Sequence, residues 1–71
     1  MISADAQAFG QLIRDRRKRL GITQDDVASV VGVNRRVVGE LERGKGSVRL
    51  DIALRVAEAV GLDVRLLERG P

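Results

Sequence analysis

The chain contains no cysteine and no histidine, and its only aromatic side chain is Phe9. Without cysteine the protein has no disulfide and no thiolate metal site. Without histidine it lacks the commonest general base and metal ligand at neutral pH. A surface that stacks unpaired bases needs several aromatic side chains, which this chain does not have. The composition therefore argues against an enzyme and a single-strand binder, and we expect no catalytic residue, no metal site and no cofactor.

Long apolar runs are also missing. No stretch approaches the roughly 20 apolar residues that cross a bilayer, and the N-terminus does not have the basic-then-apolar layout of a signal peptide. We therefore expect a cytoplasmic protein with no membrane partner. The 71 residues are enough for one small domain, whose core supplies only about 3–5 kcal/mol. Further stability has to come from close helix packing or from a second subunit.

Positive charge is modest in total but clustered along the chain. The formal net charge is +3 and the sequence pI is about 10.6. Clustering of this kind is typical of proteins that bind a polyanion, although a solvated helix face explains the first cluster equally well. The first cluster comprises Arg14, Arg16, Arg17, Lys18 and Arg19, and the second comprises Arg35, Arg36, Arg43, Lys45 and Arg49.

Four segments separated by glycines have helical periodicity, and they span about residues 5–20, 24–31, 35–43 and 50–60. Thr23 and Asn34 are suitable N-cap residues, and Asp26 occupies the capping-box position after Thr23. Gly21 and Gly32 are natural helix ends. The predicted core-facing residues are Phe9, Leu12, Ile13, Leu20, Val27, Ala28, Val31, Val37, Val38, Leu41, Leu50, Ala53, Leu54, Ala57 and Val60.

The last segment has a different period. Leu62, Val64 and Leu66 alternate with Asp63 and Arg65, which is typical of a β-strand. A lone strand cannot satisfy its own backbone polar groups. Because the chain has no second candidate strand, the simplest partner is the same strand of a second copy, which makes these three apolar residues a dimerisation element. A short fifth helix is the alternative.

The order of residues around Gly32 supports a more specific interpretation. Two short helices joined by a glycine turn form a helix-turn-helix unit. The stretch Leu20-Gly21-Ile22-Thr23-Gln24-Asp25-Asp26-Val27-Ala28, the turn Gly32-Val33-Asn34-Arg35-Arg36 and the ending Leu41-Glu42-Arg43-Gly44-Lys45 closely resemble the phage-repressor-like helix-turn-helix family. That family includes the lambda and 434 repressors, Cro and the xenobiotic-response-element-type regulators. The resemblance covers about residues 9–61.

The resemblance implies an all-α, lambda-repressor-like DNA-binding domain of four to five helices over residues 1–61. Residues 62–71 would then form a tail whose short strand pairs across a homodimer. The same resemblance implies that Gln24 contacts a backbone phosphate. The residues it places at base edges are Arg35, Arg36 and Glu40. Those it places near phosphates are Thr23, Arg43 and Lys45. An arginine near the N-terminal end of a helix in the major groove can bond to guanine O6 and N7. The predicted DNA-binding set is Thr23, Gln24, Asn34, Arg35, Arg36, Val37, Gly39, Glu40, Arg43 and Lys45.

Two members of that set depart from the family pattern, because Val37 and Gly39 stand where hydroxyl residues are common. We expect Val37 to pack, with contact to a thymine methyl as the alternative, and Gly39 to face outward and allow close approach of its backbone to DNA. Arg17 and Glu42 match family positions that form a buried or half-buried ion pair, so we assign them to the fold.

The tail also looks like that of HipB-type antitoxins, which are dimeric helix-turn-helix repressors that bind a HipA-type kinase toxin. The sequence thus predicts a repressor that reads a palindromic operator as a homodimer. A protein-interaction module, whose main role is to hold a toxin or another protein, is the alternative. A DNA binder without sequence preference is a third reading, which the basic residues at base-reading positions disfavour.

Overall fold

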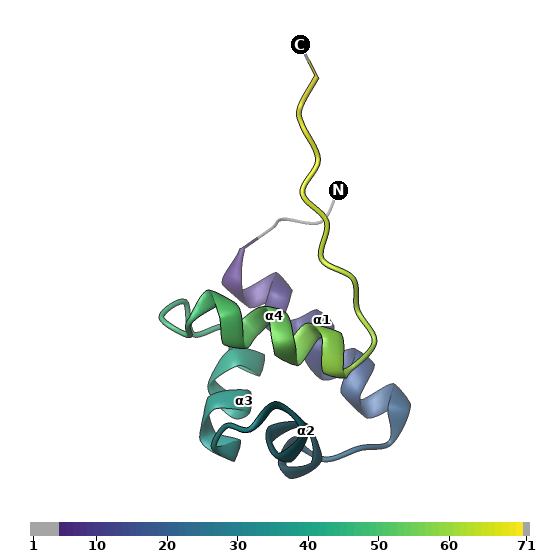
Figure 1. The fold of residues 1–71 in the computed structure, drawn as a ribbon, viewed down its shortest axis with the longest axis vertical. Helices are drawn as coiled ribbons and strands as arrows, with labels where there is room; N and C mark the ends of the chain where they lie inside the picture. The colour runs from purple at the N-terminus through teal and green to yellow at the C-terminus, as the bar shows by residue number, and fades with distance from the viewer. Residues whose placement is uncertain (1–4, 71) are drawn as a thin grey trace.

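A computed structural model describes residues 5–70, and this part of the chain folds into four helices and no strand. The helices are α1 (Ala6–Leu20), α2 (Gln24–Val31), α3 (Arg35–Glu42) and α4 (Leu50–Ala59). Helices α2 and α3 lie together at one end of the helical body, and α1 and α4 lie above them (Figure 1). The tail leaves α4 and extends away from α2 and α3, as Figure 1 shows. The all-α class and the four predicted helices are confirmed.

The predicted helix boundaries coincide with the observed caps. The Thr23 side chain accepts a hydrogen bond from the Asp26 backbone at 3.0 Å, and the Asp26 side chain accepts one from the Thr23 backbone at 2.8 Å. The Asn34 side chain accepts from the Arg36 backbone at 2.8 Å. Gly21 and Gly32 adopt the left-handed conformation that ends α1 and α2. Local side-chain chemistry therefore determines where the helix-turn-helix segment bends.

The core is made mainly of small aliphatic side chains. Its buried members are Ile13, Val27, Ala28, Val31, Val38, Leu41, Ala53, Val56, Ala57 and Val60. Four predicted core leucines are wrong, because Leu12, Leu20, Leu50 and Leu54 are 46%, 45%, 72% and 38% exposed. In α4 the buried stripe runs along residues 53, 56, 57 and 60. Leu50 lies in the first turn and Leu54 lies one step around the helix, so both are at the edge of this stripe.

Gly10 allows α1 to cross α3 at very short range. It is buried, and a Cβ built on it would overlap the backbone carbonyl oxygen of Leu41 and come within 2.9 Å of that of Glu42. Any side chain at residue 10 would therefore push the two helix backbones apart. This close crossing brings the end of α3 against α1, where Arg17 lies.

Two arginines link the ends of helices to their neighbours. Arg16 Nε donates to the Val60 carbonyl at the end of α4 at 2.9 Å. Arg55 Nη2 donates to the Val31 carbonyl at the end of α2 at 2.5 Å. Both satisfy carbonyl groups that have no partner within their own helix. Arg16 therefore has a structural contact. Neither interpretation of the first basic cluster, as a polyanion-binding surface or as a solvated helix face, included this contact.

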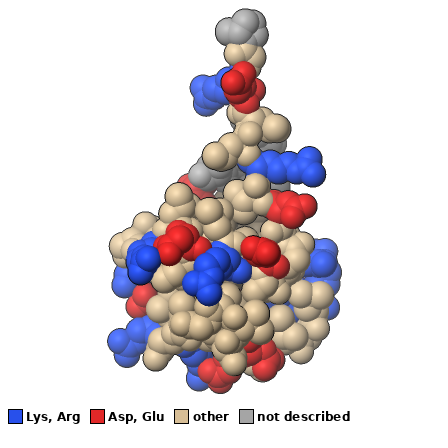
Figure 2. All heavy atoms as spheres, in the orientation of Figure 1, with Lys and Arg blue, Asp and Glu red and all other residues tan. Residues whose placement is uncertain are grey.

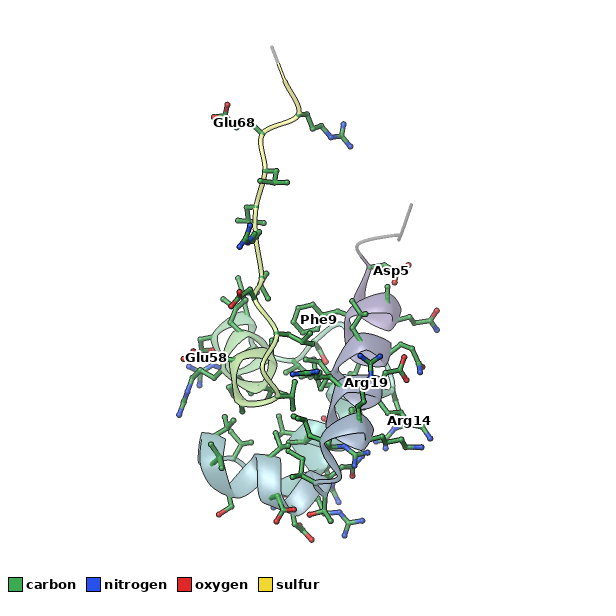
Figure 3. The ribbon with its side chains drawn as sticks, turned by 90° about the vertical axis from the view of Figure 1, so that its right-hand side faces the viewer. Asp5, Phe9, Arg14, Arg19, Glu58 and Glu68 are labelled. Carbon is green, nitrogen blue, oxygen red and sulfur yellow. The ribbon has the colours of Figure 1, made fainter. Side chains whose placement is uncertain are left out.

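Residues 62–70 form neither a helix nor a strand in the single chain. The predicted fifth helix is therefore wrong. The predicted strand is not formed either, because a strand is defined by its ladder with a neighbour and no other extended segment of the described chain lies beside the tail. Only Leu62 packs against the core, whereas Leu66 is 95% exposed. Figure 3 shows Phe9 directed from α1 toward α4 and the start of the tail, with Glu68 far from the helical body.

Candidate nucleic-acid interface

An open groove of about 360 Å³ lies where the N-terminal end of α2 meets the exposed side of α3. It brings together six of the ten residues predicted to bind DNA. These are Gln24, Asn34, Arg35, Arg36, Gly39 and Arg43. The turn at Gly32 and the Asn34 cap place the start of α3 beside the start of α2. Residues that are as much as 19 positions apart in the sequence therefore line one surface.

Arg35 and Arg36 are the first two residues of α3, and both are exposed. Within the described chain neither guanidinium has a hydrogen-bond or ion-pair partner. The backbone N–H groups of the first helical turn point toward the same end, where the helix dipole is positive. Two unpaired guanidinium groups and a helix N-terminus together favour an anionic or hydrogen-bond-accepting ligand.

Gln24 is held by a buried network beneath the groove. Its Nε2 donates to Glu42 Oε1 at 3.1 Å. Arg17 from α1 makes a two-point contact with the same carboxylate, through Nε to Oε2 at 2.6 Å and Nη2 to Oε1 at 3.0 Å. Arg17 Nη1 also donates to the Ile22 carbonyl at 3.0 Å. One carboxylate thus joins α1, α2 and α3 under the candidate site.

The charges of this network stabilise each other. Burial acts to raise the pKa of Glu42, but the hydrogen bonds from Arg17 and Gln24, with the positive charges of Arg17 and Arg14, outweigh it and lower that pKa. The hydrogen bond from Arg17 to Glu42 raises the pKa of Arg17. Glu42 is therefore ionised at neutral pH although its side chain is only 3% exposed.

The remaining predicted residues are placed less directly for a ligand. Glu40 pairs with Lys45, with Nζ 3.3 Å from Oε2, so both side chains have a partner within the chain. The Thr23 side chain takes part in the capping box. Val37 is half-buried, which agrees with packing. Gly39 lines the groove on the outer side of α3, but the ends of Gln24 and Arg43 cover it, so it is buried.

Sequence reasoning missed one neighbouring surface. Gln7, Gln11 and Arg14 of α1 line a second open depression, which also includes Arg43 and Glu42. No local motif marks Gln7 and Gln11, whereas Arg14 belongs to the first basic cluster. They reach the end of α3 only because of the close crossing at Gly10.

Basic and acidic side chains lie next to one another on the face of the molecule shown in Figure 2. The net positive charge is therefore not gathered on this side. None of the helices in residues 5–70 has the length and apolar character of a membrane span. Within residues 5–70, no group of three or more Asp, Glu, His or Cys residues could hold a metal ion.

Known proteins resemble this chain in sequence and in fold. It is 48% identical over 50 residues to an uncharacterized HTH-type transcriptional regulator of Methanothermobacter thermautotrophicus, covering 70% of this chain and 72% of the relative. It is 34% identical over 62 residues to the HTH-type transcriptional regulator y4mF of Sinorhizobium fredii, covering 87% and 82%. A HipB(S29A) chain, solved in an O2 20mer complex, superposes with a TM-score of 0.85 at 14% identity, covering 99% and 97%.

The helix-turn-helix family model matches residues 13–67, which include α2, α3 and α4 and most of α1. This match covers more than half of the chain and agrees with the four-helix fold, the capped turn at Gly32 and the two regulator sequences. The chain therefore belongs to the lambda repressor-like helix-turn-helix family.

Proposed function

We propose that the protein is a sequence-specific regulator of transcription that binds double-stranded DNA through α3. The observation that carries this proposal is the pair of exposed, unpartnered guanidinium groups of Arg35 and Arg36 at the N-terminal end of α3. Membership of the family and the regulator names of its relatives support it. The HipB chain of the same fold, solved with a 20mer, supports it further.

In the proposed complex α3 lies in the major groove. Arg36 and Arg35 face base edges, where each guanidinium can donate two parallel hydrogen bonds to guanine O6 and N7. The N-terminus of α2, with Gln24, lies against a phosphate, whose charge the helix dipole favours. Arg43 and Lys45 supply further positive charge near the backbone. Base contacts then determine sequence preference, and phosphate contacts determine orientation.

The protein acts as a homodimer in this proposal, and the tails form the contact. An antiparallel pair centred on Val64 places Leu62 opposite Leu66 of the second copy. The same register places Asp63 opposite Arg65, so both charge pairs across the symmetry axis are attractive. The tail leaves the body on the side away from α2 and α3 (Figure 1). Pairing of the tails would therefore leave both α3 surfaces free for the two halves of a palindrome.

A repressor of this kind could also hold a protein partner, and the tail favours that second role. Leu66 and Leu67 are 95% and 84% exposed, so the tail offers two adjacent apolar side chains to a partner. The fold shared with HipB makes a HipA-type kinase toxin the partner to test. A module that mainly binds such a protein is the competing function, and the two roles are compatible in an antitoxin.

Selection of bound duplexes from a random DNA pool tests the main proposal. Wild-type protein and Arg36→Ala are compared at one fixed salt concentration, because phosphate contacts make affinity fall steeply with ionic strength. We expect the wild type to enrich a palindrome. We expect Arg36→Ala to lose preference at one base pair per half-site, by about 1–3 kcal/mol. Arg55 lies on α4 away from the groove. The variant Arg55→Lys is therefore the control and should keep the wild-type preference.

Two outcomes would reject the proposal. Enrichment of no duplex would show that reading DNA is not the function and would favour the protein-interaction module. Tight binding to all duplexes alike would instead indicate a DNA binder without sequence preference.

A further inference from the structure

Gly39 lies in the middle of α3 and is buried beneath two side chains of the groove. A Cβ built on it would be 3.4 Å from Gln24 Oε1 and 3.3 Å from Arg43 Nη1. Both distances are at the short limit of van der Waals contact. The missing side chain of Gly39 therefore leaves space beside the ends of Gln24 and Arg43.

Gln24 is also held from its other side. Because the Glu42 carboxylate can only accept hydrogen bonds, the amide nitrogen of Gln24 must face it, and the structure has Nε2 at 3.1 Å from Glu42 Oε1. This arrangement turns the amide oxygen toward Gly39. Glu42 is itself held in place by Arg17 through two hydrogen bonds. The orientation of Gln24 is thus determined by an anchor at Glu42 and by the space above Gly39.

We propose that Gly39 is a positioning residue for DNA binding, which acts by leaving room for Gln24 to lie over α3 while Glu42 holds its amide. This inference rests on the proposed function. It differs from the earlier expectation that the Gly39 backbone approaches DNA directly. In this proposal Gly39 affects DNA binding through the position of Gln24 from α2. Its burial under that side chain and Arg43 favours the indirect role.

The proposal predicts opposite effects of Gly39→Ala on stability and on DNA binding. Alanine is the better helix former, and the atoms that its methyl group would meet are the far ends of two flexible side chains. The variant should therefore melt about 4 °C higher than the wild type. Displacement of Gln24 from its bound position should at the same time weaken binding to the selected duplex about fivefold. A purely structural residue would change both quantities in the same direction.

A double-mutant cycle provides the test. The dissociation constant for the selected duplex is measured for wild type, Gly39→Ala, Gln24→Ala and the double variant, together with each melting temperature. In the Gln24→Ala background there is no amide to displace, so we expect Gly39→Ala to change affinity less than about twofold. Weakening that appears only when Gln24 is present supports the proposal.

An equal loss of affinity in both backgrounds would overturn it, since the methyl group would then act on the DNA or on Arg43. Unchanged affinity of Gly39→Ala in the wild-type background would overturn it as well. Failure of the wild-type protein to bind any duplex is a separate result, because it would reject the proposed function before the cycle is measured.

Discussion

Glu42 is the only charged or polar residue that is buried in the described chain. A buried carboxylate is costly to desolvate, and its stability depends on partners that leave no lone pair unused. Here Arg17 supplies two donors and Gln24 a third. Removal of the carboxylate would leave the largely buried Arg17 guanidinium with no counter-charge.

We therefore expect Glu42→Ala to lose about 3–5 kcal/mol of unfolding free energy. This is comparable to the whole stability that a domain of this size derives from its core. Circular dichroism should show a largely unfolded protein at room temperature. Glu42→Gln keeps the shape and one acceptor oxygen, so it should be destabilised less. A melting temperature of Glu42→Ala equal to that of the wild type would contradict the structural role of the pair.

The same carboxylate makes stability depend on pH. The pKa of Glu42 in the folded state lies below its ordinary value of 4.5, because the donors and positive charges of its partners outweigh burial. Its contribution is therefore complete above pH 4.5 and is lost as the pH falls through the lowered value. Thermal melts at decreasing pH should show this loss, and Glu42→Gln should have the shallower slope. Part of the slope will remain, because hydrogen bonds from Thr23 also lower the pKa of Asp26.

At the level of the helices, Gly10 and Gly39 both lie inside a helix, but different neighbours limit the space for a side chain. At Gly10 the obstacle to a side chain is the backbone of α3, whereas at Gly39 it is the ends of two flexible side chains. A backbone pair can separate only if the helices move. Flexible side chains can move by a few tenths of an ångström without disturbing the fold.

The same substitution should therefore have opposite effects at the two positions. Gly10→Ala should destabilise the domain by about 1–3 kcal/mol or more, in spite of the better helix propensity of alanine. Gly39→Ala is the matched control and should be stabilising. Urea unfolding of both variants measures the difference. If Gly10→Ala were as stable as Gly39→Ala, the close crossing of α1 and α3 would be wrong.

Helix boundaries could be predicted from sequence more accurately than helix faces. Thr23, Asn34 and Gly32 act on their immediate neighbours, so their chemistry can be read locally. Which face is buried depends on neighbouring helices. Leu50 and Leu54 are therefore exposed, while Val56, which was not among the predicted core residues, is completely buried.

At the level of the whole molecule, the proposed dimer makes a charge-specific prediction. In the register centred on Val64, Arg65→Asp replaces two attractive pairs with two repulsive ones. The dimer dissociation constant should then rise by about tenfold. Adding Asp63→Arg restores attraction across the pair and should restore the dimer. Sedimentation or light scattering over a range of concentrations measures both variants.

Deletion of residues 62–71 should give a monomer in the same assay. A dimer that survives this deletion would show that another surface joins the two copies. Equal dissociation constants for Arg65→Asp and the double variant would reject the register while leaving the tail contact itself open to a different alignment.

The sequence by itself determined the four helices and the caps at Thr23 and Asn34, because periodicity and capping act over a few residues, and its resemblance to a known family indicated the residues near the candidate groove. Only the tertiary structure decided how those residues are used. The packing of helices covered Gly39 with the ends of Gln24 and Arg43 and placed Glu42 under Gln24. It also directed Arg16 to the end of α4. These outcomes depend on distances between segments that are remote along the chain, and no local pattern contains them.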